Sequence, residues 1–137
     1  MSYVIGHANA TVFDLLAKGG VDDIEVGGES TVIYTESIPC LEGMSYSVEV
    51  KFSGTTVRTK VELEQGNVPV TTEGSASDDF VVPDGAAELK DAITGTDTLI
   101  KAYAPAATAY MRLKVTGNTS NGANTKLVRA RITAIKS

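Results

Sequence analysis

A chain of 137 residues suits one domain, and its 42% hydrophobic and 21% charged residues are typical of a globular protein rather than a disordered one. The formal net charge of −5 repels a phosphate backbone, which argues against a nucleic-acid partner. The single cysteine, Cys40, excludes an internal disulfide, and no apolar run has the length of a membrane helix or the pattern of a secretory signal. We therefore expect synthesis in the cytoplasm and no membrane partner.

The chain begins with an apolar segment that precedes the first clear strand. Residues 1–10 contain Tyr3, Val4 and Ile5, and we interpret them as a candidate N-terminal arm that docks on a neighbouring chain. Short strands are then predicted over residues 11–16, 21–26 and 30–36, because glycine pairs separate runs of apolar and β-branched residues there.

The clearest period-two pattern runs from residue 44 to residue 65. Apolar and polar side chains alternate on both sides of residues 54–55, which predicts a hairpin with a two-residue turn. On the wet face of this hairpin Glu49 is expected opposite Lys60. The register that keeps the apolar side chains together pairs Tyr46 with Leu63, Val48 with Val61, Val50 with Thr59 and Phe52 with Val57.

Residues 66–78 have no periodicity and are long for a loop between sandwich strands. Two interpretations stay open: a crossover connection laid across the surface, or an arm that reaches a neighbouring subunit. Val68 and Val70 are the candidate contact residues of this loop. Further strands are predicted over residues 79–82 and 98–103, and residues 85–93 form either one short helix or another strand.

The C-terminal part predicts a second hairpin, in which Val115 pairs with Val128 and Leu113 with Ala130. Turn-forming residues at 117–124 separate its strands, and Asn118 and Asn121 among them are candidate partner contacts. Many short strands with frequent turns predict a single mainly-β domain over residues 1–137. We expect an antiparallel β-sandwich or barrel with at most one short helix.

The sequence shows no pattern for catalysis, a cofactor or a metal. His7, the only histidine, is expected to be solvated, and Cys40 lies among apolar neighbours as an inert residue. Glu62 and Glu64 are expected on the wet face of a strand, which argues against a glycosidase pair. Zinc would need more Cys or His ligands. The oxygen-bearing residues that calcium could use lack EF-hand spacing; they are Asp22, Asp23, Asp78, Asp79, Asp84, Asn118 and Asn121.

Several segments, in this order, carry a resemblance to known proteins: YSVEVKFS (46–53), VELEQG (61–66), TEG (72–74), FVVPDG (80–85), APA (104–106) and YMRLKVTGN (110–118). They resemble small virion proteins of tailed bacteriophages. The likeness covers residues 44–135, and no catalytic motif carries it.

This resemblance implies a jelly-roll-like β-sandwich that serves as a capsid decoration (cement) protein. Such proteins are often trimers seated on the major capsid protein, so we expect a homo-oligomer located in the virion after synthesis in the host cytoplasm. A tail or neck structural protein is one alternative. A carbohydrate-binding adhesin module is another, because the last hairpin resembles galactose-binding jelly rolls and Tyr3 or Tyr110 could stack on a sugar ring.

Overall fold

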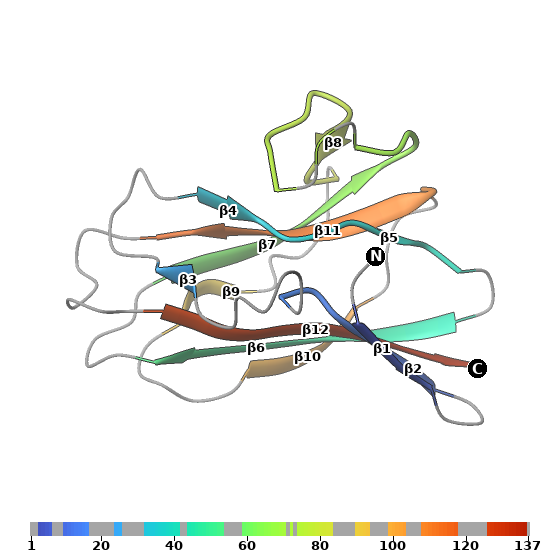
Figure 1. Ribbon diagram of the computed structural model, residues 1–137, viewed down its shortest axis with the longest axis horizontal. Helices are drawn as coiled ribbons and strands as arrows, with labels where there is room; N and C mark the ends of the chain where they lie inside the picture. The colour runs from blue at the N-terminus through green and yellow to red at the C-terminus, as the bar shows by residue number, and fades with distance from the viewer. Residues whose placement is uncertain are drawn as a thin grey trace.

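The chain forms two antiparallel sheets that pack face to face in two layers (Figure 1). The computed structural model describes residues 3–6, 10–16, 24–25, 32–41, 44–53, 59–70, 72, 74–83, 90–93, 99–103, 108–117 and 126–136, and these residues include no helix. The expected mainly-β sandwich is therefore confirmed. Sheet A contains β1 (Tyr3–Gly6), β2 (Ala10–Asp14), β3 (Ile24–Glu25), β6 (Met44–Ser53), β10 (Leu99–Tyr103) and β12 (Lys126–Lys136). Sheet B contains β4 (Val32–Tyr34), β5 (Ile38–Pro39), β7 (Thr59–Gly66), β8 (Phe80–Val81), β9 (Lys90–Ile93) and β11 (Tyr110–Thr116).

Neighbouring strands in each sheet come from distant parts of the chain. Sheet A runs β1-β2-β12-β6-β10 with β3 also paired to β12, and sheet B runs β4-β11-β7-β8 with β5 also paired to β11 and β9 to β7. The chain changes layer between β3 and β4, at both ends of β6 and at each step from β9 to β12. This order of β2-β12-β6-β10 over β4-β11-β7-β8 is that of a jelly roll, as the resemblance implies.

The core fills the space between the two layers. β6 alternates buried and half-buried residues along almost its whole length, which is the pattern of a strand with one face on a core. Val50 and Phe52 on β6 meet the inner face of sheet B, where Leu113 and Val115 on β11 are also fully buried. Burial of each such side chain contributes roughly 1.5–3 kcal/mol of hydrophobic stabilisation, so this interior holds the two sheets together.

The hairpin predicted over residues 44–65 is wrong, although both of its strands exist. β6 pairs with β12 and β10 in sheet A, whereas β7 pairs with β11 in sheet B. Glu49 consequently forms an ion pair with Arg129 of β12 (3.0 Å) and does not meet Lys60. An alternating sequence shows which face of a strand is apolar, but two apolar faces can meet either side by side in one sheet or across a sandwich.

The second predicted hairpin is wrong for the same reason. Val115 lies opposite Val61 and Ile33 in sheet B, and Leu113 lies opposite Leu63, while Ala130 lies opposite Val50 in sheet A. A shift in register between Leu127 and Arg129 adds a bulge, so Leu127 is buried and Val128 only half-buried.

The shorter predicted strands are present with narrower bounds. β2, β3, β4, β8 and β10 lie within or close to the stretches expected from the sequence. Where the sequence left a helix or a strand open at residues 85–93, the described part is strand β9. Residues 3–6 of the candidate arm form edge strand β1, in which Tyr3 lies opposite Asp14 and Ile5 opposite Val12.

Candidate functional site

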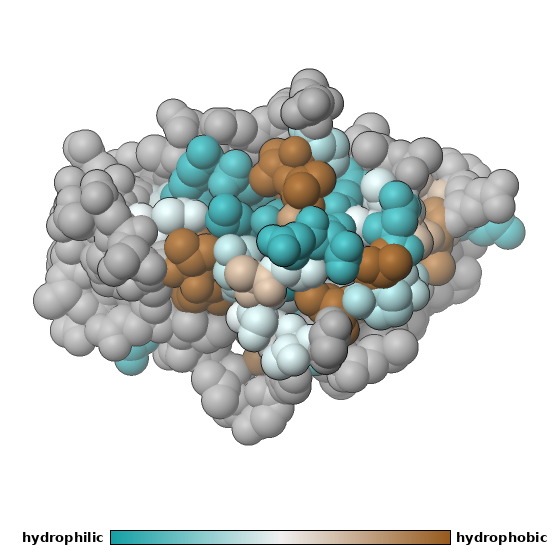
Figure 2. Space-filling view, turned by 90° about the horizontal axis from the view of Figure 1, so that it is seen from above, coloured by the Kyte–Doolittle hydropathy of each residue, from teal (hydrophilic) through white to brown (hydrophobic). Residues whose placement is uncertain are grey.

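The connection after β7 folds back over the outer face of sheet B and ends in β8 (Figure 1). We call the described residues of 66–79 the cover loop. Of the two interpretations of this segment, its placement is that of a connection laid across the protein's own surface. Figure 2 looks down on this face, where apolar and polar surfaces of the described residues alternate closely.

Arg112 fixes the cover loop to the sheet. This arginine lies on the outer face of β11 and is fully buried, because the loop covers it. Its Nε donates to Glu64 Oε1 at 2.9 Å, and its Nη1 donates to the carbonyl oxygen of Ser75 in the loop at 2.7 Å. The expectation that Glu64 lies in solvent is therefore wrong: its side chain is only 8% exposed and forms a buried ion pair.

Two aromatic rings enclose the guanidinium of Arg112. The centroid of the Tyr34 ring on β4 lies 4.4 Å from Arg112 Cζ, and that of the Phe80 ring on β8 lies 4.8 Å away. Both distances suit cation–π attraction, which strengthens when the pair is shielded from water. The side chain of Arg112, on β11, therefore contacts β4, β7, β8 and the cover loop.

Gly66 lets the loop lie close to the sheet. It is the last residue of β7, and a Cβ placed on it would approach the carbonyl oxygen of Asp79 to 2.4 Å and the Phe80 ring to 2.9 Å. Any larger residue would push β8 away from β7. Gly74 has a positive φ of 80°, which L-residues adopt at a cost, and so allows the turn above Arg112.

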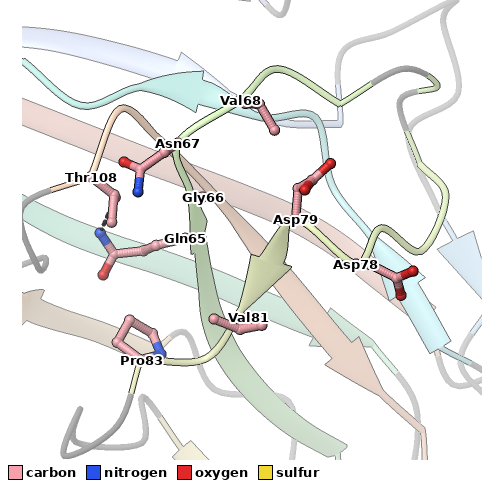
Figure 3. A pocket seen from close by; sticks show the side chains of 9 residues that line it. All are labelled: Gln65, Gly66, Asn67, Val68, Asp78, Asp79, Val81, Pro83 and Thr108. Carbon is pink, nitrogen blue, oxygen red and sulfur yellow. Dashed lines mark hydrogen bonds between the residues drawn. The ribbon is translucent and has the colours of Figure 1, made fainter.

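A pocket of about 420 Å³ opens where the cover loop leaves β7 and returns as β8 (Figure 3). Its volume lies in the lower part of the range of ligand pockets, roughly 300–1,000 Å³, but it is a shallow hollow that is wide open to solvent. Val68 and Val81 expose 44% and 59% of their surface here, so the pocket mouth is partly apolar. The lining residues are Gln65, Gly66, Asn67, Val68, Asp78, Asp79, Val81, Pro83 and Thr108.

Hydrogen bonds fix the inner wall of the pocket. Gln65 is 2% exposed, and its Nε2 donates to Thr108 Oγ1 at 2.7 Å. Asn67 Oδ1 accepts from the backbone N–H of Ala109 at 3.2 Å. Cys40 Sγ lies 3.8 Å from Thr108 Oγ1 behind this wall, and burial raises the pKa of its thiol. The raised pKa favours the thiol of Cys40 over the reactive thiolate.

The outer wall carries two acidic side chains. Asp78 and Asp79 are exposed, and neither carboxylate has an ion-pair partner among the described residues. Ser77 holds this wall in place, because its Oγ accepts from the N–H of Asp79 and its carbonyl accepts from the N–H of Phe80. The pocket therefore combines an apolar mouth with uncompensated negative charge.

The residues predicted as partner contacts fall in three places. Val68 lines the pocket, and Val70 is half-buried farther along the cover loop. Tyr3, Val4 and Ile5 belong to edge strand β1 of the other sheet, so the structure does not bring them to the pocket. Asn118 and Asn121 lie outside the described residues, as do His7, Asp22, Asp23 and Asp84.

Sequence reasoning missed Arg112 and Glu64 as a buried pair. In the sequence they alternate with apolar residues in the same way as Lys114 and Glu62, which remain partly accessible. What distinguishes Arg112 is the cover loop, because the loop residue that it binds, Ser75, is 37 residues away in the chain. No local pattern in β7 or β11 signals that contact.

Two searches of the described residues bear on other kinds of site. No group of three or more His, Cys, Asp or Glu side chains in that part of the chain is placed to hold a metal ion. The same residues contain no helix with the length and hydrophobicity needed to cross a membrane. A scan of protein-family models and a search of curated proteins give no match to this chain.

Proposed function

We propose that this chain is a structural component of a tailed-phage virion, seated on the head as a capsid decoration protein. The resemblance of residues 44–135 to small virion proteins motivates the proposal. A tail or neck position and a carbohydrate-binding module of the particle are the alternatives. In each case the chain acts by binding other molecules at its outer surface and catalyses no reaction.

The observation that carries the proposal is a pair of exposed apolar side chains, one on the cover loop and one on β8. Val68 and Val81 lie exposed on one pocket, although the loop beneath them is held firmly by Arg112, Gly66 and Phe80. Exposed apolar side chains on a surface that is already fixed in position are typical of a protein-contact site. The entropy cost of ordering such a surface on binding is small, because it is ordered beforehand.

Exposed apolar residues on sheet A offer a second contact region. Ile100 on edge strand β10 is 67% exposed, and Ile135 near the end of β12 is 46% exposed. Both lie on the outer face of sheet A, opposite the cover loop in the two-layer arrangement (Figure 1). A chain with contact surfaces on both sides suits a position between neighbours, as in a trimer on a capsid.

The test is the copy number of this chain in purified particles. Virions are purified on a density gradient and the chain is quantified by mass spectrometry against the major capsid protein. A decoration protein is expected in hundreds of copies, and a tail or neck protein in roughly ten or fewer. Absence of the chain from purified particles would refute the proposal in both forms.

The adhesin alternative is tested on the isolated protein. Light scattering coupled to size-exclusion chromatography gives its oligomeric state, and a glycan array tests sugar binding. A stable trimer without a glycan signal supports assembly on the capsid. A monomer that binds one class of glycan favours the adhesin module.

A further inference from the structure

We propose that the pocket between the cover loop and β8 receives a cationic side chain, lysine or arginine, from a neighbouring virion protein. This inference rests on the proposed function and specifies the chemistry of the contact. It uses the pocket's volume, its fixed walls and its unbalanced charge, each of which comes from different residues.

The negative charge at the pocket rim favours a cationic ligand. The carboxylates of Asp78 and Asp79 lie on the rim without an ion-pair partner among the described residues, whereas Asp14, Glu49, Glu62 and Glu64 each have a basic residue within 4 Å. The net charge of −5 adds to the same field. A cation at this rim is attracted by carboxylates that no basic side chain of the described residues neutralises.

The apolar part of the pocket selects a side chain rather than a free ion. Val68, Val81 and Pro83 add apolar surface to the same pocket, with Val81 and Pro83 on the side away from the two carboxylates (Figure 3). Lysine and arginine have aliphatic stems that pack on such a surface while the charged head stays at a polar rim. A bare cation would leave these three side chains in water.

The pocket is already shaped before binding. Gln65 and Asn67 are fixed by Thr108 and Ala109 on one wall, and Ser77 fixes Asp79 on the other. Phe80, 3% exposed, pairs with Gly66 and packs its ring where a Cβ of Gly66 would lie, which fixes the start of β8 against the end of β7. Preformed walls lower the ordering cost, so even one side chain is expected to bind measurably.

The proposal is tested by NMR on the isolated full chain labelled with ¹⁵N. The probes are the acetyl methylamides of lysine, arginine and norleucine, which has the stem of lysine without its charge. Lysine and arginine are expected to shift the amide signals of Asn67, Val68, Asp79 and Val81, and the shifts should weaken as salt is added. Norleucine should shift them much less.

Matched variants separate local charge from net charge. Asp78→Asn with Asp79→Asn should reduce the response to lysine and arginine at least threefold, whereas Glu49→Gln with Glu62→Gln removes the same charge and should leave it unchanged. Equal responses of the two variants would overturn the proposal, as would localised shifts with calcium chloride or methyl galactoside but not with the cations. Because this test needs no particle, its outcome is independent of the copy number that tests the proposed function.

Discussion

Arg112 is a buried structural residue, although its position on the polar face of a strand suggests an exposed one. It is fully buried, and its Nη2 has no hydrogen-bond partner among the described residues, so part of its desolvation cost is not repaid. Buried ion pairs of this kind add little net stability, yet losing one partner is costly. The role of Arg112 is therefore to fix where the cover loop lies.

The first prediction concerns this ion pair. Arg112→Leu leaves Glu64 buried without its partner and is expected to lower the free energy of unfolding by about 3–5 kcal/mol. Arg112→Leu combined with Glu64→Leu should recover much of that loss, because no buried charge then remains. Urea unfolding followed by circular dichroism measures both. If the double variant is no more stable than the single one, the pair does not act as described.

Gly66 gives a second prediction. Gly66→Ala places a methyl group against the Asp79 carbonyl and the Phe80 ring, so β8 must move, at an expected cost of about 1–3 kcal/mol. Hydrogen exchange at Phe80 and Val81 should become faster, and the pocket should widen. Gly74→Ala is the comparison, since it strains the backbone but meets only the Tyr34 carbonyl at 3.8 Å. It should leave exchange in β8 unchanged.

Cys40 allows a third prediction, on pH. Burial raises the pKa of the thiol, and hydrogen bonds with Thr108 and Gln65 lower it by less. Because the thiolate is the reactive form, iodoacetamide should modify folded Cys40 more slowly at pH 8 than it modifies the urea-unfolded chain. The rate should still be rising with pH where the unfolded chain has levelled off. A midpoint at or below that of the unfolded chain would contradict the placement of Cys40.

At the scale of elements, the sequence predicts where the strands lie but not which strands pair with each other. Alternation over residues 44–53 and 59–66 predicts β6 and β7 and the face each one buries. It does not predict that β6 pairs with β12, because that pairing depends on how the whole chain crosses between layers. The burial of Glu64 and Arg112 could not be predicted for a related reason, since it depends on a loop whose contact with Arg112 comes from Ser75, 37 residues away in the chain.

The strand partners lead to the fourth prediction. In a Cys40→Ser background, Ser47→Cys and Thr133→Cys place two thiols directly opposite each other on β6 and β12. Side chains in such pairs are about 4.5–5.5 Å apart at Cβ and a disulfide needs about 3.5–4.5 Å, so a small movement of the strands should let mild oxidation form a disulfide within the monomer. Glu49→Cys with Lys60→Cys tests the hairpin alternative and should not cross-link. The reverse result on a non-reducing gel would show that β6 and β7 share one sheet.

At the scale of the molecule, apolar side chains of the described residues fill the interior, so the proposed contacts with other proteins lie on the outer surfaces. The core residues of both sheets fill the space between the layers, and the exposed large apolar side chains of the described residues lie on β4, β8, β10, β12, the cover loop and the segment after β5. The virion role proposed for this chain requires these surfaces to bind neighbouring subunits. A jelly roll with contacts on both outer faces suits that role.

The most direct measurement is add-back to particles that lack this chain. Virions are prepared from a phage with the gene deleted, the purified folded protein is added, and both the bound copies and the temperature of DNA release are measured. We predict binding that saturates at a fixed ratio to the major capsid protein and a higher release temperature. Failure of the folded protein to bind, or binding that never saturates, would contradict a structural role on the capsid.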